Sequence, residues 1–254
     1  MAKVICVANQ KGGVGKTTTA VNLSACLAVA ERRTLLIDLD PQGNASSGLG
    51  ISKDGLEKNV YQALIENCSL DKTIQHTEIE HLDIVPSNID LIGAEIEFVN
   101  MEDREKRLKA ALEKVRDSYE FIVIDTPPSL GLLTINSLTA ADAVLIPLQC
   151  EFYPLEGLSQ LLKTINLIKR NLNPSLFIEG ILLTMYDVRT LISQQVTEEI
   201  RRLFKDQVLQ TIIPRSVRLS EAPSFGKPII LYDIKSKGAA AYLNLAKELI
   251  SNAA

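Results

Sequence analysis

The stretch that decides the fold is Lys11-Gly12-Gly13-Val14-Gly15-Lys16-Thr17-Thr18-Thr19. It follows a short apolar run at residues 3–8 and leads directly into a segment of helical period. A strand, a glycine-rich turn and a helix start, in that order, are the context in which such a turn binds phosphate. Glycines let successive backbone N–H groups point at phosphate oxygens, and the helix N-terminus adds partial positive charge. These residues therefore predict a phosphate-binding loop.

The loop carries two lysines and departs from the usual phosphate-loop pattern at its start. That pattern, G-x-x-x-x-G-K-[ST], requires glycine where this chain has Gln10, and Lys11 follows instead. Lys16 is expected to reach the terminal phosphates, and the Thr17 hydroxyl to ligate Mg²⁺. Lys11 is either solvated or adds positive charge to a nucleotide, such as one held by a facing subunit. The expected nucleotide contacts of the loop are Lys11, Gly12, Gly13, Val14, Gly15, Lys16, Thr17 and Thr18.

The rest of the chain alternates short apolar runs with longer segments of helical period, which is typical of β-α-β units around a mainly parallel sheet. The expected strands are 3–8, 34–38, 82–85, 121–125, 143–148, 177–183 and 208–213. The expected helices are roughly 16–30, 103–117, 131–140, 155–170, 191–204 and 238–250. Since no repeat, low-complexity tract or linker interrupts the chain, we expect one α/β domain over residues 1–254, with helices on both faces of a twisted sheet.

Two stretches show no regular period. Residues 41–58 are rich in glycine, serine and asparagine and are expected to form a mobile loop. Residues 214–228 contain three prolines, Pro214, Pro223 and Pro228. Because long loops in compact domains are often functional, both stretches are natural places for a ligand or a partner to act.

Three aspartates follow predicted strands and are the candidate catalytic and metal-binding carboxylates. Asp125 closes the apolar run Phe121-Ile122-Val123-Ile124, so it lies at the carboxyl end of a buried strand, where it is expected to hold Mg²⁺ through water. Asp38 and Asp40 are two residues apart and face the same side in extended backbone. Both are expected near the terminal phosphate and its attacking water. The competing interpretation of Asp40 is that Asp40-Pro41 only starts a turn.

Composition and charge exclude several classes of protein. With 46% hydrophobic residues the chain is not disordered, and its net charge of −4 argues against a protein that coats nucleic acid over its whole surface. No segment resembles a signal peptide or a membrane span, so we expect a cytoplasmic protein. The cysteines Cys6, Cys26, Cys68 and Cys150 have no metal-ligand spacing and are interpreted as buried or incidental thiols. His76 and His81 lie in a polar segment without a partner motif and are expected to be solvated.

Four segments together resemble the deviant-Walker ParA/MinD superfamily, and most closely the chromosomal, Soj-like ParA ATPases. They are residues 11–18, Asp38-Leu39-Asp40-Pro41-Gln42-Gly43-Asn44, Phe121-Ile122-Val123-Ile124-Asp125-Thr126-Pro127-Pro128, and residues 213–223. The resemblance covers nearly the whole chain. It implies a P-loop NTPase fold and a Mg²⁺-dependent ATPase that dimerises around ATP.

The resemblance also implies roles for single residues. Lys11 is the family's signature lysine, which reaches across a dimer interface to the partner's nucleotide. Asp40 positions or activates the attacking water, while Asp38 supports Lys16 or the metal shell. Pro214 and Ser216 line the adenine base. Since Lys11 completes the site only in the dimer, ATP turnover should be slow until dimerisation and a partner assemble it.

A basic segment points to DNA. Residues 185–237 hold nine basic and six acidic residues, a net charge of +3, so the rest of the chain carries −7. Mixed solvated charge is the ordinary explanation for such a segment, but chromosomal ParA dimers bind DNA without sequence preference when ATP is bound. Arg189 and Arg218 match basic positions used in that family and are the first candidates, followed by Arg201, Arg202 and Lys205. Binding to the DNA backbone predicts a steep salt dependence.

The resemblance further implies a nucleoid-associated partitioning protein whose ATP hydrolysis is stimulated by a ParB-like, centromere-bound partner. One alternative is a MinD-like membrane-associated ATPase, which would end in a basic amphipathic helix. Residues 239–252 contain one Lys and one Glu and are instead expected to pack on the domain, so no membrane partner is expected. An iron-protein relative is disfavoured because its cysteine ligands have no counterpart here. A ParA-like positioner of another cargo would share every motif and stays open.

Overall fold

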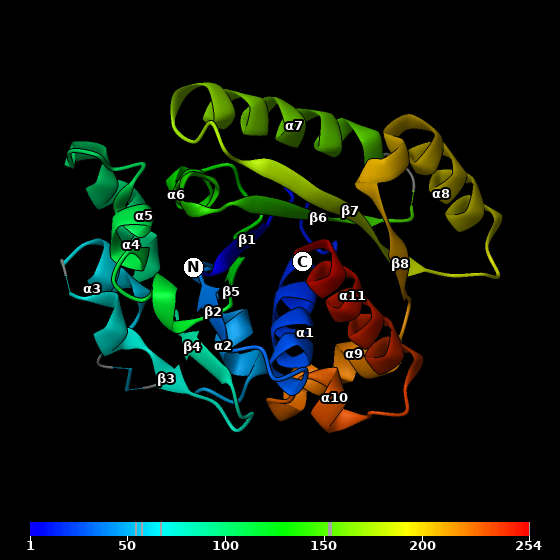
Figure 1. Ribbon diagram of the computed structural model, residues 1–254, viewed down its shortest axis with the longest axis horizontal. Helices are drawn as coiled ribbons and strands as arrows, with labels where there is room; N and C mark the ends of the chain where they lie inside the picture. Colours follow the sequence, from blue (N-terminus) through cyan, green and yellow to red (C-terminus); the bar gives the residue numbers. More distant parts are fainter. Residues whose placement is uncertain (54, 57, 67, 152–153, 254) are drawn as a thin grey trace.

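The computed structural model describes residues 1–53, 55–56, 58–66, 68–151 and 154–253. Its centre is an eight-stranded sheet in the order β3-β4-β2-β5-β1-β6-β7-β8, parallel throughout except for the antiparallel pair β3 and β4 (Figure 1). The strands are β1 (Lys3–Val7), β2 (Thr34–Asp38), β3 (Gln75–His76), β4 (Leu82–Val85), β5 (Phe121–Asp125), β6 (Ala143–Gln149), β7 (Phe177–Tyr186) and β8 (Val208–Pro214). Every expected strand is present within three residues of its expected end, and among the described residues the one strand that was not expected is the two-residue β3.

Helices cover both faces of this sheet, which confirms the predicted fold class. The longer helices are α1 (Lys16–Val29), α6 (Leu132–Ala140), α7 (Pro154–Asn171), α8 (Leu191–Phe204) and α11 (Lys237–Ala253). Figure 1 shows α6 and α7 on one side of the sheet and α1 and α11 on the other. Along β1 the side chains alternate between two cores: Val4 and Cys6 join one cluster, and Ile5 and Val7 the other. The period-2 alternation of a strand thus divides the core into two layers.

The expectation of a mobile loop at residues 41–58 is wrong for its first part. Residues Asn44–Gly48 form helix α2, in which Ala45 and Ser46 are buried. Gly43 starts the helix at φ +60, and a Cβ there would lie 2.8 Å from the Ser87 carbonyl oxygen. The backbone N–H and hydroxyl of Ser46 both donate to a buried carboxylate on β2, so tertiary contacts fix a segment that has no helical period of its own. Asp54 and Glu57 of this stretch lie outside the described residues.

The expected helix at 103–117 is also wrong in its extent. Only α5 (Arg107–Leu112) and a short 3-10 turn at Arg116–Ser118 are helical. Asp103 has φ +50, which a helix cannot continue. The stretch 214–228 is likewise not a plain loop, because it contains α9 (Val217–Glu221) and a 3-10 turn at Ala222–Phe225. The short helices α3 (Val60–Leu64), α4 (Leu91–Glu97) and α10 (Ile229–Tyr232) were not expected.

The last helix, α11, packs on the domain as expected from its composition. Tyr242, Leu245 and Leu249 are buried on its inner face, in the same apolar cluster as Leu23 and Leu27 of α1. A hydrogen bond of 3.3 Å joins the Tyr242 and Thr19 hydroxyls of the two helices. The apolar face of α11 is therefore used within the fold.

Candidate functional site

Three strands end side by side at one edge of the sheet and bring the predicted motifs together. In the β-sheet register, Asp125 at the end of β5 lies opposite Val7 of β1 and Asp38 of β2. The glycine-rich loop follows β1, so it begins next to both aspartates. The carboxyl edge of a parallel sheet is where α/β proteins bind their ligands.

The glycine-rich loop turns tightly between β1 and α1. Gly13 and Gly15 have φ of +72 and +89, which is the left-handed region that glycine adopts freely. The Asn9 amide donates to the Pro147 carbonyl (2.7 Å), and its oxygen accepts the Lys11 N–H (3.0 Å). On the far side the Thr184 hydroxyl donates to the Val14 carbonyl (2.9 Å). The loop is therefore held in place from β6 and from β7.

The two lysines of the loop lie in different surroundings. Lys16 is only 6% exposed, and its Nζ donates to the Lys11 carbonyl oxygen at 3.1 Å, so the side chain folds back along the loop. Burial lowers the pKa of Lys16, while the charges of Asp125 and Asp40 oppose that shift. Lys11, in contrast, is exposed to solvent. Lys16 is thus placed inside the site, and Lys11 at its surface.

Asp125 is buried without a partner that offsets its charge. The side chain of Asp125 is fully buried, and neither of its carboxylate oxygens has a hydrogen-bond partner of normal geometry among the described residues. Burial, together with the negative charge of Asp38, raises the pKa of Asp125 well above its ordinary value, and a polar contact with the Thr17 hydroxyl opposes this rise. Buried polar atoms almost always have partners. A cation beside Thr17 and Asp125 would satisfy this carboxylate.

The other two aspartates organise the segment that follows β2. Asp38 is fully buried: its Oδ1 accepts the Asp40 N–H (3.1 Å), and its Oδ2 accepts the Ser46 N–H (2.8 Å) and hydroxyl (2.7 Å). Burial nevertheless raises the pKa of Asp38 to about 6. Asp40 is 8% exposed, and its Oδ1 accepts the Gln42 N–H at 2.9 Å. Asp40 therefore does start a turn, and it also adds negative charge beside Lys16.

A cavity of about 370 Å³ opens next to the glycine-rich loop. Its wall includes Gly15 and Thr18 from the loop and the predicted adenine contacts Pro214 and Ser216 from the far end of the chain. The remaining lining residues are Thr184, Met185, Ile213, Arg215, Leu219, Ser220, Pro223 and Tyr242. The fold thus places the phosphate loop and the segment after β8 around one cavity, although they are about two hundred residues apart in sequence.

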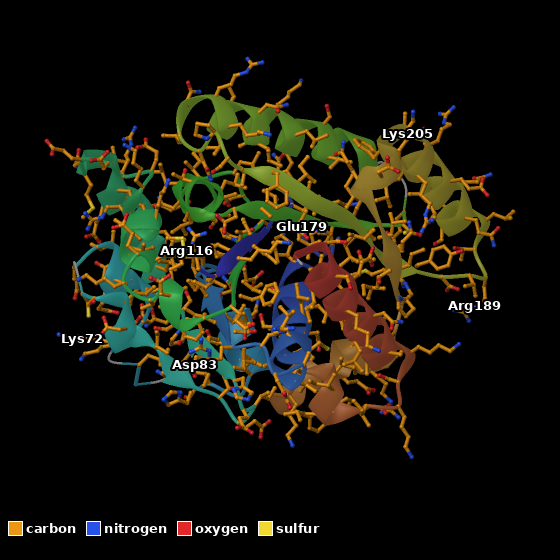
Figure 2. The ribbon with its side chains drawn as sticks, in the orientation of Figure 1. Lys72, Asp83, Arg116, Glu179, Arg189 and Lys205 are labelled. Atoms are coloured by element: carbon orange, nitrogen blue, oxygen red, sulfur yellow. The ribbon has the colours of Figure 1, made fainter. Side chains whose placement is uncertain are left out.

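The candidate DNA-binding residues are spread over the surface. Arg189 lies in the turn before α8, and Lys205 follows the end of that helix, so the two are at opposite ends of α8 (Figure 2). The side chains of Arg189 and Arg218 are 83% and 57% exposed. Arg201 is half-buried and Arg202 is exposed. The structure therefore separates the stronger candidate, Arg189, from the cluster at 201–205.

Both leading arginines are held by carboxylates. Arg189 pairs with Asp187 at 2.7 Å, and Arg218 pairs with Glu221 at 3.0 Å and with Asp233 at 3.6 Å. The sum of charges along the sequence does not reveal these pairs. The net charge of +3 already includes these carboxylates, so the pairs show where it is not located: the two leading arginines are largely neutralised by their own neighbours.

Several residues of the site were not singled out from the sequence. Ser46 is the main hydrogen-bond partner of Asp38 and also accepts the Ser87 N–H at 3.0 Å. Thr184 fixes the loop, and Met185 lines the cavity with φ +52. The positive φ of Met185 has no sequence signal, because glycine or asparagine would be the usual residue there.

Among the described residues, no histidine or cysteine lines the cavity. His76 is exposed and pairs with Asp83 at 2.6 Å. Cys6, Cys26 and Cys150 are buried free thiols, and Cys68 is half-buried. Burial raises the pKa of the Cys26 thiol to about 12, so it stays protonated at neutral pH. In the described part of the chain, no helix is both long and apolar enough to cross a membrane.

Comparison with known proteins agrees with this geometry. A family model described as an AAA domain matches residues 2–178. The chain is 60% identical over 250 residues to a chromosome partitioning protein ParA of Myxococcus xanthus (strain DK1622), covering 98% of this chain and 88% of that protein. It is 59% identical over 252 residues to the sporulation initiation inhibitor protein Soj of Bacillus subtilis (strain 168), covering 99% of this chain and 100% of that protein.

A solved structure gives the same fold. It is a cobyrinic acid a,c-diamide synthase from Mycobacterium smegmatis with bound ATP analog and magnesium, with a TM-score of 0.88 and 39% identity over 99% of this chain and 96% of that chain. The similarity to the partitioning proteins extends over nearly the full length of this sequence. The chain therefore belongs to the ParA/Soj family of chromosome partitioning ATPases.

Proposed function

We propose that this chain is a Mg²⁺-dependent ATPase switch that works as one domain over residues 1–254. In this proposal ATP joins two copies, the dimer binds nucleoid DNA in the cytoplasm without sequence preference, and hydrolysis releases it. The observation that carries the proposal is the buried, unpartnered carboxylate of Asp125 next to Lys16 and the glycine-rich loop. Such a group is costly unless the site receives a cation.

The residues around Asp125 fit Mg²⁺. Mg²⁺ prefers oxygen ligands, and it commonly takes one or two from the protein and the rest from water and substrate phosphates. The Thr17 hydroxyl and the Asp125 carboxylate would supply the protein's oxygens, directly or through water. When bound there, Mg²⁺ would neutralise charge on the transferred phosphate.

The loop would hold ATP by its backbone and by Lys16. The N–H groups of residues 12–18 bind phosphate oxygens, and buried Lys16 adds a positive charge that water does not screen. Phosphoryl transfer depends mainly on such positioning and charge neutralisation. The cavity between Gly15 and Pro214 has the size and position to take the nucleoside.

Asp40 is the residue we propose for handling the attacking water. It is nearly buried, it lies close enough to Lys16 to shift its pKa, and its backbone N–H is fixed by Asp38. Asp38 and Ser46 then act as positioning residues, since their hydrogen bonds fix the backbone on both sides of Asp40. Slow turnover would follow from a site that only a second copy completes.

Lys11 is the residue we propose to reach the second copy. It is exposed on the loop that would carry the nucleotide, whereas Lys16 is turned inward to the Lys11 carbonyl. Arg189 and Arg218 are proposed to contact DNA phosphate, and a ParB-like partner to stimulate hydrolysis. Support for these roles is the membership of the family, together with the exposed position of both arginines.

The membrane-associated alternative has less support. A membrane-binding terminal helix needs an exposed apolar face, but the apolar face of α11 packs against α1. A ParA-like positioner of another cargo would use the same site and differs only in its partner.

The test is light scattering coupled to size-exclusion chromatography with ATP and Mg²⁺, with ADP and Mg²⁺, and with EDTA. The wild type should be dimeric only with ATP and Mg²⁺, and Lys16→Ala should stay monomeric in all three. Lys109→Ala, which removes an exposed lysine on α5, is the matched control and should behave as the wild type. ATP-dependent dimers of the Lys16→Ala protein would contradict the proposed nucleotide site.

A further inference from the structure

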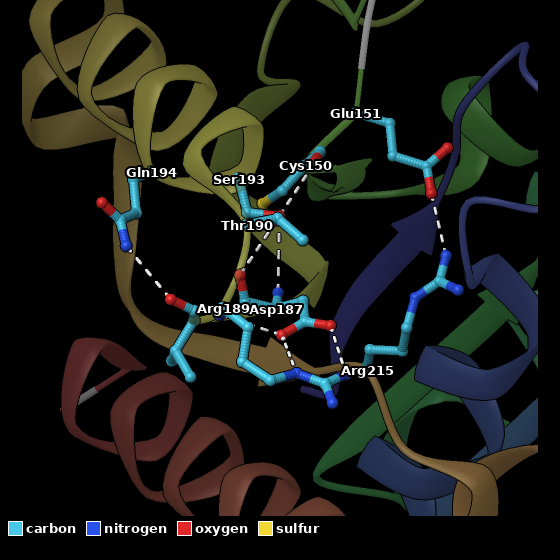
Figure 3. A network of polar contacts seen from close by, with 9 residues as sticks. Cys150, Glu151, Asp187, Arg189, Thr190, Ser193, Gln194 and Arg215 are labelled. Carbon is cyan, nitrogen blue, oxygen red and sulfur yellow. Dashed lines mark hydrogen bonds and ion pairs between the residues drawn. The ribbon is translucent and has the colours of Figure 1, made fainter.

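The guanidinium of Arg189 is already bound within its own turn. Its Nε donates to Asp187 Oδ1 at 2.9 Å and its Nη2 to Oδ2 at 2.7 Å, while the Arg189 backbone N–H also donates to Oδ1 at 3.0 Å (Figure 3). This is the bidentate geometry in which arginine binds a carboxylate or a phosphate. Asp187 therefore occupies the Nε–Nη2 edge of the guanidinium and neutralises the charge that a DNA phosphate would meet, which leaves only the Nη1 side for a phosphate.

Asp187 is held in position by the surrounding turn. Its N–H donates to the Ser193 hydroxyl (3.4 Å), and its carbonyl accepts the Thr190 hydroxyl (3.1 Å). Ser193 in turn donates to the Cys150 carbonyl at the end of β6 (3.2 Å), and Gln194 donates to the Val188 carbonyl (3.1 Å). The Asp187 side chain is 17% exposed, against 83% for Arg189. The carboxylate is thus a fixed acceptor, and the arginine is its more exposed partner.

The turn adjoins the wall of the cavity described above. Met185 and Arg215 both line the cavity, and the Arg215 N–H donates to the carbonyl of Tyr186, the residue between Met185 and Asp187 (2.9 Å). Arg215 also pairs with Glu151 at 2.9 Å. The hydrogen bonds from Arg189 lower the pKa of Asp187, and the charge of Arg215 adds a smaller effect in the same direction. Met185 has φ +52, a conformation that bulky residues rarely adopt and that often marks functional sites. The wall of the cavity is therefore joined to the backbone that carries Asp187 by the chain from Met185 to Asp187 and by the Arg215–Tyr186 hydrogen bond.

We propose, on the basis of the proposed function, that Asp187 competes with DNA phosphates for Arg189, and that filling the cavity beside Met185 and Arg215 weakens this competition. The competition follows from charge and from the shared edge: while Asp187 holds the Nε and Nη2 N–H groups, that edge cannot bind phosphate, and the carboxylate repels a phosphate beside it. Asp187 then lowers DNA affinity in every state, and most strongly when the cavity holds no base. This adds a second route, besides dimerisation, by which nucleotide controls DNA binding.

The test uses Asp187→Asn, which removes the charge while keeping an oxygen to accept the Arg189 N–H. Binding to a fluorescent duplex of mixed sequence is measured by anisotropy at low salt without nucleotide, with ADP and Mg²⁺, and with ATP and Mg²⁺. Glu198→Gln, an exposed carboxylate on α8, makes the same change in net charge and is the matched control. Arg189→Gln and the double variant Asp187→Asn/Arg189→Gln complete the cycle, and circular dichroism checks that all variants are folded.

Asp187→Asn is expected to bind DNA about two- to fivefold more tightly than Glu198→Gln without nucleotide, the range that an exposed ion pair supports. The gain should shrink with ADP and vanish in the double variant. Equal affinities of Asp187→Asn and Glu198→Gln, or a gain that survives in the double variant, would overturn the competition. A gain of the same size with and without ADP would overturn the link to the cavity.

The Arg189→Gln and Asp187→Asn variants distinguish a failure of the proposed DNA contact from a failure of this inference. If Arg189→Gln binds DNA as the wild type does with ATP, Arg189 is not a DNA contact, and both the assignment and the inference fall. If Arg189→Gln weakens binding but Asp187→Asn matches its control, only the inference falls.

Discussion

Replacing Asp125 by asparagine should stabilise the chain in Mg²⁺-free buffer and reduce the stabilisation that ATP and Mg²⁺ provide. Asp125 is fully buried without a hydrogen-bond partner for either oxygen among the described residues, and it lies near the negative charge of Asp38. Asparagine is still a buried polar group, so the gain comes from removing the charge, and we take the extra cost of a charged over a neutral buried group as about 1–3 kcal/mol. For a chain of this length, 1 kcal/mol corresponds to about 2–4 °C in Tm. The expected rise in Tm is therefore roughly 2–12 °C.

The effect should grow with pH. Burial raises the pKa of Asp125 and of Asp38, the latter to about 6, so the folded state binds more protons than the unfolded state between about pH 4 and these raised values. Stability conferred by a raised pKa is complete below the unfolded pKa and is lost as pH rises through the folded one. The wild type should lose stability over this range, and Asp125→Asn should lose less. The difference between them is accordingly largest at pH 8.

The assay is thermal unfolding followed by circular dichroism at pH 5 and pH 8, in EDTA and in Mg²⁺ with a non-hydrolysable ATP analogue. A ligand at a hundred times its Kd stabilises by about 2.7 kcal/mol, and the variant should gain less than the wild type does. Asp117→Asn, an exposed carboxylate, is the control and should change neither value. A variant that is less stable than the wild type in EDTA at pH 8, or that gains equally from Mg²⁺ and nucleotide, would refute the reasoning.

Three further substitutions test separate parts of the site. Asp40→Ala should accumulate as an ATP-bound dimer with phosphate release lowered about 10²–10⁴-fold, and unchanged release would assign the water to another group. Ser46→Ala removes hydrogen bonds to Asp38 and from Ser87, so urea unfolding should show a loss of about 1–3 kcal/mol; a wild-type midpoint would mean that these bonds are replaced. Arg218→Gln should dimerise normally but bind DNA more weakly, with a salt slope lower by about 0.9 per lost phosphate contact, and an unchanged slope would place the contact elsewhere.

The sheet was predictable because its strands are buried on both faces. Runs such as Phe121-Ile122-Val123-Ile124 are uniformly apolar, and five residues of β5 are buried in the structure. The helices that were missed have no such signal. Helix α2 forms because Ser46 donates a hydrogen bond to Asp38 and because Gly43 adopts the left-handed conformation at which the helix starts. The sequence does not show that Ser46 and Asp38 come together, because only the folded chain brings them into contact. At residues 103–117 the prediction gave too much helix. The segment has a helical period, but the sequence does not show that Asp103 takes a positive φ, which a helix cannot include.

The phosphate loop and the carboxylates were predictable because each stands next to a strand end. Parallel strands bring their carboxyl ends to one edge, so Val7, Asp38 and Asp125 meet without further information. The state of these groups was not predictable, because the pKa of Asp125 depends on its burial and on how close Asp38, Thr17, Asp40 and Lys16 come to it in the fold. The net charge of the basic segment was counted correctly, but the count did not show that Arg189 and Arg218 pair with carboxylates two and three residues away.

The most direct test of the account is a DNA titration of the wild type with ATP, with ADP and without nucleotide, in Mg²⁺ and at several salt concentrations, beside sedimentation with anionic lipid vesicles. DNA binding is expected to be strongest with ATP, to fall steeply with salt, to be independent of DNA sequence, and to occur without vesicle binding. DNA affinity that is the same in all three nucleotide states, or ATP-dependent sedimentation with the vesicles in place of DNA binding, would contradict it.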